Sequence, residues 1–134
     1  MARFLAPLVL VIALFGASPA VAGVAPNLNL YGGQTKNGSE TTSRSVKGSC
    51  TITQAVTDLV LRCDGKGTAQ ANYLFTVPKT AGSVTTDVTF DGAHKQAIVA
   101  TKRVSDTQFR VTVTLKGPGR ADLQSVMIRY YYHV

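Results

Sequence analysis

The sequence predicts an all-β protein, which we expect to be a single antiparallel β-sandwich, Ig-like or similar, or a small barrel, with one disulfide. From residue 46 onward, short runs of β-branched and aromatic residues alternate with turn signals about every ten residues. This spacing is typical of sandwiches and barrels with roughly seven or eight short strands. The chain has 2 cysteines, and outside the segment between them it shows no helical pattern of about ten residues.

Residues 1–22 have the features of a secretory signal peptide. Arg3 supplies a positive charge, residues 4–15 form an apolar run broken only by Pro7, and the small residues Ala20 and Ala22 fit cleavage after Ala22. The apolar run is too short to span a bilayer core of about 30 Å comfortably. No cysteine stands at or near the cleavage site, so we do not expect a lipid anchor. We therefore expect a secreted, extracellular protein with no membrane span.

Export would place the cysteines in an oxidising compartment, where they are expected to form one disulfide. The whole chain has 14 lysines and arginines against 7 acidic residues and a net charge of +7, which becomes +6 once Arg3 is removed. This charge favours an anionic cell-envelope or matrix polymer, or a protein partner, and export argues against nucleic acid. Net charge also serves solubility, so it does not by itself establish a partner.

Residues 23–45 are rich in Gly, Asn, Ser and Thr, and we expect them to form a flexible N-terminal arm. The apolar residues Leu28, Leu30 and Tyr31 are able to supply one edge strand. Asn37 precedes a glycine, which is a turn signal, and it also begins an N-glycosylation motif that matters only where the source organism glycosylates secreted proteins. Residues 46–134 then form the β-sandwich domain.

The segment from Cys50 to Cys63 fits two structures. Its apolar residues recur at the spacing of an amphipathic helix, and they are Ile52, Ala55, Val56, Leu59, Val60 and Cys63. Folded as a hairpin with Gln54 opposite Leu59, the segment instead places Cys50 opposite Cys63 and Ile52 opposite Leu61.

A disulfide between Cys50 and Cys63 would exclude the helix. Thirteen helical residues would hold the cysteines about 20 Å apart, whereas a disulfide needs Cα atoms within about 7 Å of each other. The β-branched residues of the segment also favour strands. Residues 55–58 are not a strong turn sequence, however, so the sequence alone leaves both structures open.

The turn signals and the apolar residues of the last three strands predict how these strands pair with one another. A two-residue turn at 105–106 would place Lys102 opposite Phe109, and a loop over 117–122 with Pro-Gly at its centre would place Phe109 opposite Tyr130. This register puts every apolar pair of the three strands on one face, which is how register is normally determined.

The opposite face of these strands is the candidate binding site, and it would hold Arg103, Arg110, Arg129 and Tyr131. In this register Arg110 lies directly opposite Arg129, which is destabilising unless an anion or carboxylate lies between them. Guanidinium groups suit carboxylate, phosphate and sulfate. The alternative is that the arginines are solvated or pair with an aspartate such as Asp87.

The loop over 116–120 supplies two further candidate binding residues, Lys116 and Arg120. An exposed loop of this kind would also suit a secreted inhibitor or toxin-like effector that presents it to a target protein. This effector is the first alternative to a binding module.

Catalytic signals are few, and we expect a protein that is not an enzyme and that uses no cofactor or metal. The 2 histidines could at most form His94–Asp91 or His133–Asp106 pairs, and their separation gives no zinc-like spacing. A small hydrolase that uses His133 and Asp106 is the second alternative to a binding module.

Overall fold

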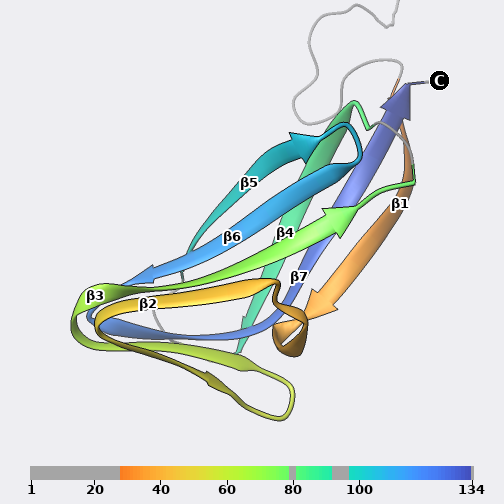
Figure 1. The fold of residues 1–134 in the computed structure, drawn as a ribbon. Coiled ribbons are helices and arrows are strands. Elements are labelled where there is room, and N and C mark those ends of the chain that lie inside the picture. The colour runs from red at the N-terminus through yellow and green to blue at the C-terminus, as the bar shows by residue number, and fades with distance from the viewer. Residues whose placement is uncertain (1–27, 79–80, 92–96, 134) are drawn as a thin grey trace, which may run out of the picture. The chain divides into compact units, whose positions relative to one another are not determined.

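A computed structural model describes residues 28–78, 81–91 and 97–133. The described residues form one antiparallel sheet of seven strands, so the predicted all-β fold is confirmed (Figure 1). Residues 30–132 make up one compact unit. The predicted signal peptide and His94 lie outside the described residues.

The elements are β1 (Leu28–Asn37), a 3-10 turn η2 (Gly38–Glu40), β2 (Ser43–Gln54), β3 (Leu59–Thr76), β4 (Ser83–Asp91), β5 (Ile98–Ser105), β6 (Gln108–Lys116) and β7 (Gly119–His133).

The longest strand, β3, organises the sheet. One edge of β3 pairs with β2 along almost its whole length. The other edge pairs first with the start of β7, over Leu59 to Cys63, and then with β6, over Thr68 to Thr76. Figure 1 shows β3 bending at the end of the sheet where β6 is joined to β7. Strands β6 and β7 therefore follow one another along the same edge of β3.

Alternate residues of β3, β6 and β7 face the same core, as expected for strands with one buried face. The buried residues of β3 are Leu59, Leu61, Cys63, Ala69, Ala71, Tyr73 and Phe75. Those of β6 are Phe109, Val111, Val113 and Leu115, and those of β7 are Ala121, Leu123, Val126, Ile128, Tyr130 and Tyr132. Strand β5 stands at one end of the strand order, whereas β4 pairs with β7, and a 2.7 Å hydrogen bond between the Thr86 and Thr101 hydroxyls joins β4 to β5.

The cysteine hairpin has the predicted register. Cys50 pairs with Cys63, Ile52 with Leu61 and Gln54 with Leu59, and the two cysteines form a disulfide with a Cα–Cα distance of 4.0 Å. The helical alternative is therefore excluded. The weak turn sequence is closed by hydrogen bonds, because the Ala55 amide and the Gln54 side-chain amide both donate to the Asp58 carbonyl, at 2.8 and 3.1 Å.

The predicted register of the last three strands is wrong in two respects. The β5–β6 turn lies at 106–107, a bulge follows Arg103, and Arg103 instead of Lys102 pairs with Phe109. Strand β6 pairs with β3, where Phe75 lies opposite Phe109, and β7 does not fold back on β6. A one-residue slip moves every side chain to the other face of a strand, so the first error changes the candidate site.

The segment expected to be a flexible arm contains β1, which lies next to β7 in the sheet. The Gln34 side chain donates a 2.6 Å hydrogen bond to the Thr76 carbonyl, and Asn37 caps η2 by accepting from the Ser39 amide at 2.9 Å. Strand β2 begins at Ser43, so the boundary predicted at residue 46 falls inside a strand. The flexibility of the segment stays a prediction.

Tyr73 is a polar residue in the centre of the core. Its hydroxyl is buried and has no hydrogen-bond partner among the described residues. Burial raises the pKa of Tyr73 to about 12, and the Arg44 charge opposes this shift while the Glu40 charge adds to it. The folded state therefore favours the neutral phenol.

We expect Tyr73→Phe to raise the free energy of unfolding by about 1 kcal/mol at pH 7, because it removes a buried hydroxyl without a partner. Since the pKa is higher in the folded state, the wild type loses stability as the pH rises from about 10 to 12. The stability difference between variant and wild type should therefore widen by about 1.4 kcal/mol at pH 11. Urea unfolding at both pH values measures this, and a constant difference would contradict the raised pKa.

Candidate anion-binding face

The register of β2, β3, β6 and β5 places one set of mostly polar residues on the surface opposite the core, since residues opposite each other in a sheet share a face. We call this surface the outer face. Its rows across the strands are Lys47–Thr68–Lys116, Ser45–Gln70–Thr114–Ile98, Ser43–Asn72–Thr112–Ala100, Leu74–Arg110–Lys102 and Thr76–Gln108–Ser105. The ionisable residues of these rows are all cations, and no aspartate or glutamate occurs in them.

Lys102 and Arg110 lie directly opposite each other on the outer face, and both are exposed. Like charges in this position repel one another and destabilise the pairing of the two strands. Neither residue forms an ion pair with another residue of the described part of the chain. The pair is therefore a local concentration of positive charge that an anion would relieve.

A second cross-strand pair of like charges, Arg62 and Arg120, is neutralised within the protein. Arg62 Nε lies 3.0 Å from a carboxylate oxygen of Asp64, and Arg120 Nε lies 3.0 Å from one of Asp122. Each arginine thus has a carboxylate two residues further along its own strand. The two pairs therefore differ: each cation of the Arg62–Arg120 pair has a carboxylate partner, whereas Lys102 and Arg110 form no ion pair with another described residue.

Arg103 does not belong to the outer face, contrary to the sequence prediction. It pairs with Phe109, and its guanidinium carbon lies 4.7 Å from the centre of the Phe109 ring. It donates hydrogen bonds to the Ala81 carbonyl at 2.6 Å and to the Asp106 carbonyl at 3.3 Å. The bulge after Arg103 explains the change, because it shifts the register of β5 by one residue. These contacts give Arg103 a role in joining β5 to the segment just before β4.

The predicted pairing of Arg110 with Arg129 is also wrong. Arg129 lies opposite Thr85 of β4, and Tyr131 lies opposite Ser83, whereas Arg110 lies between Leu74 and Lys102. The reason is that β7 takes β3, β4 and β1 as its partners and not β6. Of the predicted binding residues, only Arg110 and Lys116 lie on the outer face.

The 116–120 segment does not protrude as a loop. Strand β6 ends at Lys116 and β7 begins at Gly119, and the Gly117 amide donates a 3.1 Å hydrogen bond to the Gly67 carbonyl. The segment is therefore attached to β3, and the effector alternative lacks the rigid protruding loop that would favour it.

The hollow found among the described residues does not lie beside Asp106. It has a volume of about 210 Å³, lies instead on β2 and is lined by Arg44, Ser45, Val46 and Ile52. None of these residues could act as a general base toward the Ser45 hydroxyl. The side chain of His133 lies outside the described residues, so the hydrolase alternative stays a prediction.

Three carboxylates gather from separate elements of the fold. Oxygen atoms of Asp58, Asp91 and Asp122 lie within 4.8 Å of one another, and such oxygens are ligands that calcium accepts. Arg120 already donates to both oxygens of Asp122, at 3.0 and 3.4 Å. Among the described residues this is the group that could hold a metal ion. Its members are far apart in the chain, so no sequence spacing indicates it.

Comparison of the chain with protein-family models, with curated proteins and with solved structures found no match. No helix in the described part of the chain is both long and apolar enough to span a membrane.

Proposed function

We propose that the protein is a non-catalytic binding module whose outer face attaches to an anionic polymer of a cell envelope or extracellular matrix. The observation that carries the proposal is the exposed cross-strand pair Lys102–Arg110, neither member of which forms an ion pair with another described residue. The pair costs stability unless an anion lies between its two charges. An arginine beside a lysine offers several N–H donors to a carboxylate, sulfate or phosphate group.

Secretion is part of this proposal. It is supported by the signal-peptide pattern of residues 1–22 and by the Cys50–Cys63 disulfide, since such bonds persist mainly in oxidising compartments. The charge of the whole chain is +7, or +6 once Arg3 is removed with the signal peptide, and it adds a long-range attraction toward anionic surfaces.

We expect Lys102→Glu to weaken binding to immobilised dextran sulfate at least tenfold at low salt. The substitution should also raise the free energy of unfolding by about 0.2–1 kcal/mol, because it turns a like-charge pair into an opposite-charge pair. Retention at increasing salt and urea unfolding measure the two effects, and wild-type binding should fall as salt screens the charges.

The matched control is Arg129→Glu, which changes the net charge by the same amount on an exposed residue of β7 that lies outside the outer face. It should weaken binding less than threefold. Equal losses for the two variants would mean that net charge alone attracts the polymer. Unchanged binding of Lys102→Glu would show that this pair is not the site.

A further inference from the structure

We infer that the bound polymer is an acidic polysaccharide lying along β3 and β6, with its acidic groups at the cationic ends of the outer face and its hydroxyls between them. This inference rests on the proposed function and specifies the class of ligand. It comes from the order of the rows: cations occupy the Lys47–Thr68–Lys116 row and the Leu74–Arg110–Lys102 row, and two uncharged rows lie between these.

The two uncharged rows form a hydrogen-bonded network of amides and hydroxyls across β2, β3 and β6. The Asn72 side chain donates to the Ser43 hydroxyl at 3.1 Å and accepts from the Thr112 hydroxyl at 2.8 Å. In the next row, the Gln70 side chain donates to the Thr114 hydroxyl at 3.2 Å. These bonds hold the side chains in one arrangement, which lowers the entropy cost of binding a ligand there.

The network keeps donors and acceptors for a ligand. Asn72 retains a second N–H, Thr114 retains its O–H, and the oxygens of Gln70 and Thr112 retain lone pairs. Sugar hydroxyls both donate and accept, so they can use this mixture, whereas ionised phosphate, sulfate and carboxylate groups only accept. The uncharged rows are therefore complementary to the hydroxyl-bearing part of a ligand and the cationic rows to its acidic groups.

The length of the outer face favours an extended polymer. Six residues of β3 separate the Thr68 row from the Leu74 row, which corresponds to about 20 Å of strand at about 3.4 Å per residue. One small anion or lipid head group cannot reach both cationic rows. The rows contain no aromatic residue, and single-stranded nucleic acid is usually held by stacking on aromatic side chains.

The test compares four polymers on the wild-type protein by calorimetry at one salt concentration. Alginate carries carboxylates and hydroxyls, polyglutamate carboxylates without hydroxyls, dextran hydroxyls without charge, and oligo-dT phosphates with bases. Alginate should bind at least tenfold more tightly than polyglutamate, and dextran should bind least. Thr112→Val with Thr114→Val should reduce alginate affinity to that of polyglutamate and leave polyglutamate affinity unchanged.

The outcomes separate this inference from the proposed function. Equal affinity for alginate and polyglutamate would overturn the polysaccharide inference and leave the anion-binding function in place. Absence of binding to all three charged polymers would overturn both. Tightest binding to oligo-dT would replace the polysaccharide with nucleic acid. The comparison of polymers on the wild type decides these cases even if the valine variant fails to fold.

Discussion

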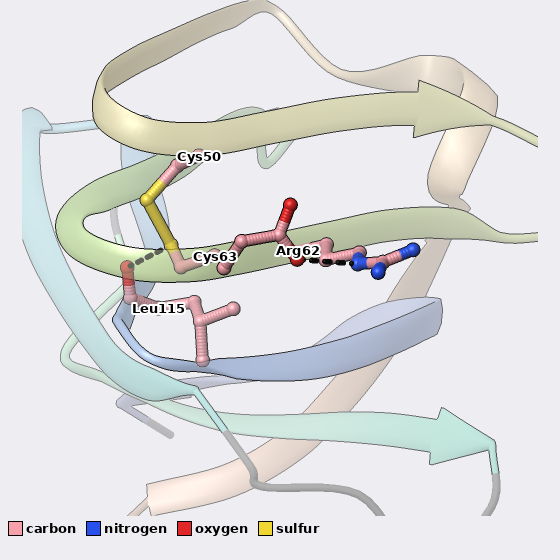
Figure 2. Close-up of a disulfide and its surroundings, with 5 residues drawn as sticks. Cys50, Arg62, Cys63 and Leu115 are labelled. Atoms are coloured by element: carbon pink, nitrogen blue, oxygen red, sulfur yellow. Dashed lines mark hydrogen bonds and ion pairs between the residues drawn. A yellow bond between two sulfur atoms is a disulfide. The ribbon is translucent and has the colours of Figure 1, made fainter.

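Replacing Cys50 and Cys63 together by alanine is expected to lower the free energy of unfolding by about 2–4 kcal/mol. The disulfide closes a loop of sequence separation 13, which restricts the unfolded chain. Both cysteines are also buried, and Cys63 Sγ lies 4.0 Å from the Leu115 carbonyl oxygen of β6 (Figure 2). The variant therefore loses packing beside β6 as well as the covalent bond between β2 and β3.

Urea unfolding of the wild type with and without reductant, and of the double variant, measures the loss. The reduced wild type and the variant should have similar midpoints, both below that of the oxidised protein. An unchanged free energy of unfolding in the double variant would mean that the hairpin register is maintained by its hydrogen bonds and apolar pairs alone.

Gly67→Ala should destabilise the protein by about 3 kcal/mol or more, through backbone strain and overpacking. Gly67 has φ +147°, and a Cβ added there would lie 2.2 Å from the Lys47 carbonyl oxygen and 2.9 Å from Cys50 Sγ. The carbonyl belongs to the paired strand β2 and cannot move without breaking the ladder. Gly67 also accepts the hydrogen bond from Gly117, so the strain would reach the junction of β6 and β7.

Gly65→Ala is the matched control, two residues away in the same bend of β3. Its Cβ would meet only the Ser49 side chain, at 3.4 and 3.5 Å, which is ordinary contact. We expect a change within about 1 kcal/mol, since a compatible Gly→Ala substitution mainly restricts the unfolded chain. Thermal unfolding of the two variants side by side measures the contrast. A small effect of Gly67→Ala would show that β3 can bend there without a glycine.

The sequence by itself determined the class of fold and the register of the cysteine hairpin, although it left a helix open for the same segment until the Cys50–Cys63 disulfide excluded it. Both depend on local information: alternation of apolar residues and turn signals, and two cysteines close enough in the chain to be opposite one another. In the pairing of Cys50 with Cys63 and Ile52 with Leu61, side-chain pattern and covalent geometry agree. Arg110 was also identified as an exposed cation of a β face, whereas Lys116 was expected in a loop and lies at the end of β6.

The partners of β6 and β7 were decided only by the tertiary structure. A chain segment containing Pro-Gly is compatible with a reverse turn, but β3 is 18 residues long and offers one edge to both strands in succession. Pairing with β3 buries Phe109 against Phe75 and Leu123 beside Leu59. Such contacts join residues far apart in the chain, and periodicity carries no information about them.

In the candidate site, too, the sequence predicted part of the arrangement and the tertiary structure decided the rest, here through a shift of one residue in β5. The sequence predicted that Arg110 lies opposite Arg129 of the last strand, but β6 pairs with β5 and β3 instead, and the bulge after Arg103 places Lys102 opposite Arg110. A bulge adds one residue to a strand and reverses the faces beyond it. Beside the bulge, Arg103 contacts the Phe109 ring and the Ala81 carbonyl, and these contacts exist only once β5, β6 and the segment before β4 are assembled.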